Sequence, residues 1–156
     1  MTTVPDPGER FARTLAATPD MEDIPWSPLC KPLSQCRVAL VTTGGVHLKS
    51  QTAFDVVNDG QYWSYREIPS DTRSGDLMVT HHHYDHAHVD KDVNFMLPVD
   101  RFRDMVKEGK VGSLGPRFFS FCGYIRDPQA LMNTTAKDVA AHLRADGVDA
   151  VFLTPA

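Results

Sequence analysis

The most constraining feature of this 156-residue sequence is an apolar run from Arg37 to Thr43 that ends at the glycine pair Gly44-Gly45. A run of this length without polar alternation predicts a β-strand that is covered on both of its faces. The glycine pair predicts a tight loop directly after the strand, because glycine reaches backbone angles that other residues avoid. A strand covered on both faces is typical of a layered α/β domain.

The rest of the pattern alternates between strands and helices. We expect further strands at 62–68, 76–80 and 148–154, helices at 98–109 and 127–145, and a strand or a loop at 116–124. The sequence therefore predicts an α/β fold, a layered domain with a mainly parallel central sheet flanked by helices. Ligands in such sheets bind beyond the carboxyl ends of strands, which directs attention to the loops after Thr43, Thr80 and Thr154.

We expect the α/β domain to occupy residues 37–156, and residues 1–36 to form a short helix at 6–18 and an extended arm. The net charge of −4 argues against nucleic acid and membrane partners, because both attract basic surfaces. The sequence has no apolar run of about 18 residues and no signal peptide, so we expect a cytoplasmic protein. Cys30 and Cys36 are either a redox pair or two unrelated thiols.

Five of the seven histidines and three aspartates lie in the segment 80–92, directly after a predicted strand. Imidazole nitrogens and carboxylate oxygens are ligands of first-row metals such as Zn²⁺ or Fe²⁺. The expected ligands are His81, His83, Asp85 and His86. The alternatives are a solvated polar loop and acid–base chemistry without a metal. No nucleotide cofactor is indicated.

The segment from Thr80 to His86 also matches T-H-x-H-x-D-H, the fingerprint of metallo-β-lactamase-type hydrolases. Those enzymes are two-sheet sandwiches that take further ligands from later loops. Here the one later histidine, His142, falls inside a predicted helix. The alternating strands and helices also predict a different architecture, so a metallo-hydrolase is kept as an alternative only.

Three ordered blocks carry a family resemblance. They are 38–51, then 76–86 running into Asp90, Asp92 and Asn94, and then 145–154. Over about residues 24–156 the chain resembles the selenoprotein B subunits of glycine, sarcosine, betaine and D-proline reductases. The resemblance implies a thiol- or selenol-dependent reductase that cleaves a carbon–heteroatom bond of an amino-acid-like, small-molecule substrate. It also implies a thiol electron donor or partner reductase subunits.

The resemblance also implies roles for single residues. His47, Tyr84 and Arg117 would face the substrate, with Arg117 as a clamp for a carboxylate. The alternatives are a hydrogen-bonded loop histidine for His47 and an ion pair within the protein for Arg117. The catalytic selenocysteine or cysteine of the family would follow Ala156, so the α/β domain is incomplete relative to the family. We expect a selenocysteine codon read as a stop; a deliberate truncation and a natural short relative are the alternatives.

Without that redox residue we expect a partial or inactive reductase. The alternative is a module that binds a metal or small ligand at the loop from His81 to Asp92 without turnover. A last strand with no covering helix leaves a sheet edge exposed, which predicts a homo-oligomer.

Overall fold

The structure is a computed structural model that describes residues 27–56, 63–82, 84–123, 125 and 128–156. The predicted helix at 6–18 and most of the arm lie outside these ranges. Within them the order is η2 (Leu33–Gln35), β1 (Arg37–Thr42), β2 (Val46–Leu48), β3 (Tyr65–Pro69), η3 (Ser74–Asp76), β4 (Leu77–Val79), η4 (Val93–Phe95), α2 (Val99–Lys107), β5 (Ser113–Leu114), β6 (Arg117–Phe121), α3 (Pro128–Asn133), α4 (Thr135–Ala145) and β7 (Ala150–Thr154).

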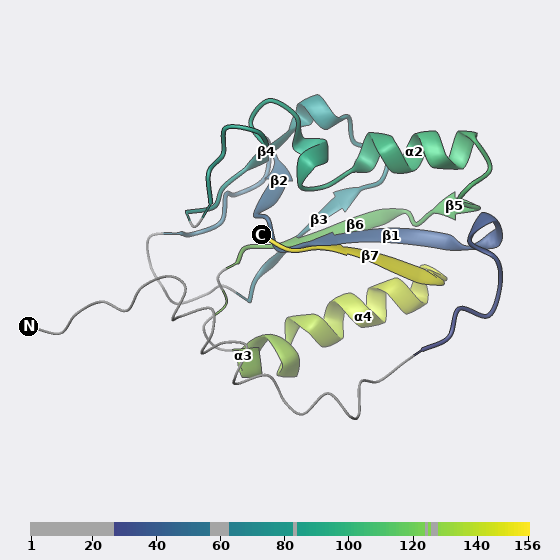
Figure 1. Cartoon of the computed structure of the whole chain (residues 1–156). Coiled ribbons are helices and arrows are strands. Elements are labelled where there is room, and N and C mark those ends of the chain that lie inside the picture. The colour runs from purple at the N-terminus through teal and green to yellow at the C-terminus, as the bar shows by residue number, and fades with distance from the viewer. Residues whose placement is uncertain (1–26, 57–62, 83, 124, 126–127) are drawn as a thin grey trace, which may run out of the picture.

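The central sheet is built around β1 (Figure 1). On one edge β1 pairs in parallel with β5 and β6, and on the other edge β7 pairs in parallel with it from Val38 to Thr42. Only β3 runs against its neighbour, since it pairs antiparallel with β6. The predicted α/β fold with a mainly parallel sheet is therefore confirmed.

Helices cover both faces of this sheet, with α2 on one side and α3 and α4 on the other (Figure 1). Neighbouring residues of a strand point to opposite faces, and β6 shows this clearly. Phe118 belongs to the core cluster that includes Val99 and Phe102 of α2. Phe119 packs instead with Val139 of α4. The apolar run of β1 is buried, as predicted, because helix layers cover both faces of the sheet.

The strand expected at 76–80 is present as β4, but it does not belong to the central sheet. It pairs antiparallel with β2 in a separate two-stranded sheet. The cause lies at Gly45, whose φ of 68° turns the chain out of the central sheet directly after β1. The expectation that the loop after Thr80 follows a strand of the parallel sheet was therefore wrong.

The prediction of a single helix at 127–145 is also wrong in part, because two helices, α3 and α4, occupy the described residues of this range. The break is at Thr134, whose backbone (φ −124°, ψ −99°) is not helical. Gly109 and Gly147 follow α2 and α4 and both adopt positive φ, which is typical of residues just past a helix end. In the part of the chain that the structure describes, no helix has the length and apolar character needed to cross a membrane.

Candidate functional site

The carboxyl ends of three strands meet at Thr43. The amide of Thr43 donates to the carbonyl of Thr154 at 3.1 Å, and the amide of Gly123 donates to the carbonyl of Thr43 at 2.7 Å. The amide of Ala156 donates to the hydroxyl oxygen of Thr43 at 3.0 Å. The segments that leave β1, β6 and β7 are therefore tied together at one end of the sheet.

The histidine loop reaches the same end although β4 lies outside the sheet. The amide of Gly45 donates to the carbonyl of Phe121 at 2.8 Å, and the amide of Thr80 donates to the carbonyl of Gly45 at 2.9 Å. The hydroxyl of Tyr84 donates to the carbonyl of Gly44 at 3.2 Å. The glycine pair thus connects the loop that follows Thr80 to the carboxyl ends of β1 and β6.

Three aromatic rings of this loop form what we call the His81–Tyr84–His86 cluster. The ring centroids of His81 and Tyr84 are 4.6 Å apart, and those of Tyr84 and His86 are 4.8 Å apart. A Cβ placed on Gly123 would lie 3.2 Å from His81 Nε2 and 3.7 Å from the carbonyl oxygen of Ala156. His81 of the cluster and the end of the segment that follows β7 therefore both border the space that a side chain on Gly123 would occupy.

The electrostatics of the cluster keep the phenol protonated. Burial, and after it the negative charge of Asp90, raises the pKa of Tyr84 to about 12. The phenol is therefore neutral at physiological pH and acts as a donor. The carboxylate of Asp90 lies 3.6 Å from His86 Nδ1. His86 Nε2 is buried and has no hydrogen-bond partner among the described residues.

Cys122 is a neighbour of the cluster that the sequence did not indicate. Its thiol donates to the carbonyl of Gly123 at 3.1 Å and lies 3.6 Å from the carbonyl of Thr80. Burial raises the pKa of Cys122 to about 11, although the guanidinium of Arg66 opposes that shift. The thiol is therefore protonated near neutral pH and a poor nucleophile. A single cysteine followed by glycine matches no metal or redox spacing, so the sequence carried no signal for this position.

His47 is fully buried in β2, and both of its ring nitrogens have partners. Nδ1 donates to the carbonyl of Leu48 at 2.8 Å, since a carbonyl oxygen can only accept. Nε2 lies 2.9 Å from the hydroxyl of Thr80. The ring thus joins β2 to the start of the histidine loop, and its nitrogens are engaged within the fold.

Arg117 lies at the other end of the sheet. It begins β6, whereas the cluster lies beyond the carboxyl end of that strand. Its guanidinium donates to both carboxylate oxygens of Asp146 at 2.8 and 3.0 Å and to Glu67 at 2.9 Å. The structure therefore does not bring Arg117 together with Tyr84, and it gives the guanidinium two carboxylate partners of the protein itself.

The expected metal ligands are only partly assembled. Asp85 is exposed, and its Oδ1 accepts a hydrogen bond from the amide of Ala87 at 2.9 Å. His83 lies outside the described residues, so the pairing expected of His81 and His83 is outside them too. In the described ranges, no three histidine, cysteine, aspartate or glutamate side chains converge as a metal site would require.

The metallo-hydrolase alternative requires further ligands from later in the chain, and His142 was the one later histidine. In the structure His142 belongs to α4 and stacks on Phe119, with its Nε2 3.7 Å from Glu67. It is therefore part of the helix layer that covers the sheet and does not join the cluster. The α/β fold also differs from a sandwich of two sheets.

Comparisons with known proteins agree with the resemblance. The family model described as glycine/sarcosine/betaine reductase selenoprotein B matches residues 7–156. The D-proline reductase subunit gamma of Acetoanaerobium sticklandii is 40% identical over 129 residues, which are 83% of this chain and 52% of that protein. The glycine reductase complex component B subunit gamma of Carboxydothermus hydrogenoformans is 32% identical over 155 residues, covering 94% of this chain and 34% of that protein.

The sarcosine reductase complex component B subunit beta of Peptoclostridium acidaminophilum is 32% identical over 152 residues, again covering 94% of this chain and 34% of that protein. The chain thus spans between about a third and about half of the length of these relatives. No solved structure matches the chain.

Proposed function

Because the chain belongs to the glycine/sarcosine/betaine reductase selenoprotein B family, we propose that it is part of a thiol- or selenol-dependent reductase subunit. The proposed reaction is cleavage of a carbon–heteroatom bond, such as the C–N bond of an amino-acid-like substrate. The relatives are named as subunits of D-proline, glycine and sarcosine reductases. Since the chain spans only part of them, the activity is proposed for the larger protein.

The proposed reaction is a two-electron reduction. The C–N bond breaks, the carbon gains a hydrogen, and the nitrogen leaves as an amine that carries the proton it needs. Two thiols, or a selenol and a thiol, supply the two electrons and two hydrogens and become a disulfide or a selenenylsulfide. The His81–Tyr84–His86 cluster offers imidazoles and a neutral phenol that bind the substrate and move protons at this site.

One observation carries the proposal: His81 Nε2 and the carbonyl oxygen of Ala156 lie 3.2 and 3.7 Å from the position that a Cβ on Gly123 would occupy. The resemblance expects the redox residue directly after Ala156, at the carboxyl end of β7. A residue attached there would lie close to His81 of the His81–Tyr84–His86 cluster. Imidazoles next to a thiol or selenol favour its ionised, nucleophilic form.

For the 156-residue chain alone we propose binding without turnover. Cys122 is buried and protonated near neutral pH, and Cys36 is buried with its thiol 3.4 Å from the carbonyl of Pro32. Cys30 is exposed but precedes the amino end of β1, at the opposite end of the sheet from the cluster. No cysteine of the described residues therefore presents a reactive thiol to the cluster.

The proposal is tested with two proteins, the 156-residue chain and a version extended past Ala156 by the family's redox segment, each combined with the partner subunits. The assay measures release of ammonia or an amine from glycine, sarcosine and betaine, and ring opening of D-proline to an open-chain amino acid, each in the presence of a dithiol. We expect cleavage of at least one substrate by the extended protein and of none by the short chain.

His81→Ala in the extended protein should lower the rate strongly, because it removes the imidazole beside Gly123. His88→Ala is the matched control, since His88 belongs to the same loop but stacks on the exposed ring of Phe95. Equal activity of the short and extended proteins would contradict the assignment of the redox residue. Absence of activity from both, with partner subunits bound, would contradict the proposed reaction.

A further inference from the structure

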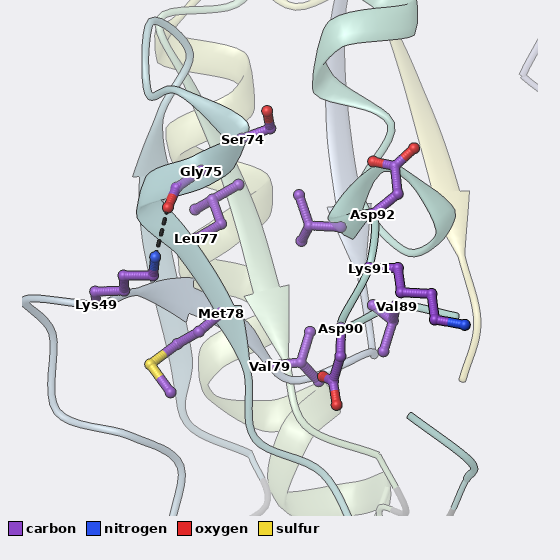
Figure 2. Close-up of a pocket in the computed structure, with 11 residues that line it drawn as sticks. Lys49, Ser74, Gly75, Leu77, Met78, Val79, Val89, Asp90, Lys91 and Asp92 are labelled. Atoms are coloured by element: carbon purple, nitrogen blue, oxygen red, sulfur yellow. Dashed lines mark hydrogen bonds between the residues drawn. The ribbon is translucent and has the colours of Figure 1, made fainter. Parts of the chain in front are cut away.

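A cavity of about 450 Å³ lies between β4 and the turn formed by residues 89–93 (Figure 2). This volume falls within the range of small-molecule sites, roughly 300–1,000 Å³. Apolar side chains of both walls contribute to the lining, among them Leu77, Val79 and Val89. Leu77 and Val89 are buried, so this lining is a fixed part of the core.

The charged side chains around this apolar lining differ in how available they are to a ligand. In Figure 2 the carboxylates of Asp90 and Asp92 lie toward opposite ends of the cavity, and the amine of Lys91 points away from it. On the other wall, the amine of Lys49 donates to the carbonyl of Gly75 at 2.6 Å. The cavity therefore presents carboxylates to a ligand, while its two lysine amines are turned away or engaged.

Of the two carboxylates, Asp92 is already compensated. It accepts hydrogen bonds from the amide and the side chain of Asn94 at 3.0 and 2.8 Å, and Arg101 lies 3.7 Å from it. Asp90 differs, because no lysine or arginine of the described residues lies within 4.0 Å of its carboxylate. The basic group that does lie within this distance is the imidazole of His86, whose Nδ1 is 3.6 Å away.

A carboxylate without a cationic partner beside an apolar wall has a clear chemical complement. It attracts a positive charge, and the apolar wall favours an alkyl group attached to that charge. We infer that this cavity binds an ammonium group carried on a short alkyl chain, with Asp90 as the anionic partner and Leu77, Val79 and Val89 against the chain.

Asp90 also links the cavity to the candidate site, because its carboxylate faces His86 of the His81–Tyr84–His86 cluster. A ligand held at Asp90 therefore lies next to the residues to which the reduction is assigned. The inference that the cavity holds the substrate's amino group rests on the proposed function. The inference that it binds an alkylammonium ion rests only on the lining of the cavity.

The test is amide-resolved NMR of the 156-residue chain with three probes of similar size: propylammonium chloride, β-alanine and sodium propionate. We expect propylammonium to shift the resonances of Val79, Val89 and Asp90 in a saturable way, and propionate to leave them unchanged. β-Alanine distinguishes two classes of ligand that carry the same ammonium group. If β-alanine binds, the site accepts amino acids; if it does not bind, the site is restricted to simple amines.

Asp90→Asn should weaken propylammonium binding about tenfold, because it removes a charge-assisted hydrogen bond. Asp104→Asn on α2 is the matched control, since Asp104 is an exposed carboxylate paired with Lys107 outside the cavity. No saturable shift with propylammonium, binding of propionate alone, or equal affinity in Asp90→Asn would each overturn the inference. Binding without reduction by the extended protein would instead overturn only the proposed function.

Discussion

The hydroxyl of Tyr84 donates a 3.2 Å hydrogen bond to the carbonyl of Gly44, 40 residues earlier in the chain. This bond holds the histidine loop against the turn that ends β1, and the phenol ring contacts the rings of both His81 and His86. The loop is therefore positioned by the central sheet even though its own strand, β4, belongs to a separate sheet.

Tyr84→Phe tests this attachment and its pH dependence. The variant should unfold about 1 kcal/mol more easily near neutral pH, because it loses one hydrogen bond. Folding raises the pKa of Tyr84 from 10.0 to about 12, so the stability from this group is complete below pH 10 and is lost as the pH rises toward 12. Urea unfolding at a series of pH values should show a shallower alkaline decline in the variant.

Some alkaline decline should remain in Tyr84→Phe, because burial also raises the pKa of Tyr65 and of Cys122. The difference between the two proteins is therefore the quantity to compare. Identical slopes between pH 10 and 12 would show that Tyr84 titrates in the folded protein as it does in the unfolded chain.

Arg117→Met tests the ion pairs at the amino end of β6. The variant should lose about 1 kcal/mol of stability at neutral pH, because Asp146 and Glu67 lose a shared partner while remaining partly hydrated. The hydrogen bonds from Arg117 hold the pKa of Asp146 below 3.8. This contribution is therefore present above pH 3.8 and is lost as the pH falls through the folded-state pKa.

Urea unfolding at pH 7 and at pH 3 measures this contribution, and Lys107→Met provides the control because Lys107 pairs with Asp104 on the surface of α2. The control should stay within about 0.5 kcal/mol of the parent at both pH values. A stability loss in Arg117→Met that is as large at pH 3 as at pH 7 would contradict an ion-pair origin.

The zinc or iron site expected in the histidine loop stays a prediction, and the structure sharpens its test. Since the described donors do not form a group of three, we expect His83 to complete the site. Protein purified without a histidine tag should hold about one equivalent of Zn²⁺ or Fe²⁺ by elemental analysis. His83→Ala should hold none, whereas His88→Ala should keep it. A metal content far below one equivalent in the parent protein would contradict the prediction of a metal site.

Homo-oligomer formation also stays a prediction, and β7 is where we place it. Among the described strands β7 pairs only with β1, and the side chain of Leu153 is 69% exposed. An exposed apolar edge strand favours association. Light scattering at micromolar concentration should give at least a dimer, and Leu153→Lys should dissociate it. Met132→Lys, at an exposed position of α3, should not. A monomeric parent protein would contradict the prediction.

Local sequence patterns predicted most elements because each rests on neighbouring residues. The apolar run before Gly44-Gly45 became β1, and Gly109 and Gly147 end their helices with positive φ. Thr134, by contrast, interrupts a continuous helical pattern. The side chain of the next residue, Thr135, donates to the carbonyl of Trp63, a contact between residues far apart in sequence that no local periodicity reports.

In the candidate site, too, some features could be predicted from the sequence and others depend on tertiary contacts. The sequence by itself determined the α/β class, the family and the histidine loop, because ordered blocks and residue types identify these without knowledge of contacts. Only the tertiary structure decided that His81, Tyr84 and His86 lie beside Cys122 and that Arg117 lies at the far end of the sheet. These placements follow from the pairing of β1 with β6 and β7, which joins residues from opposite halves of the chain.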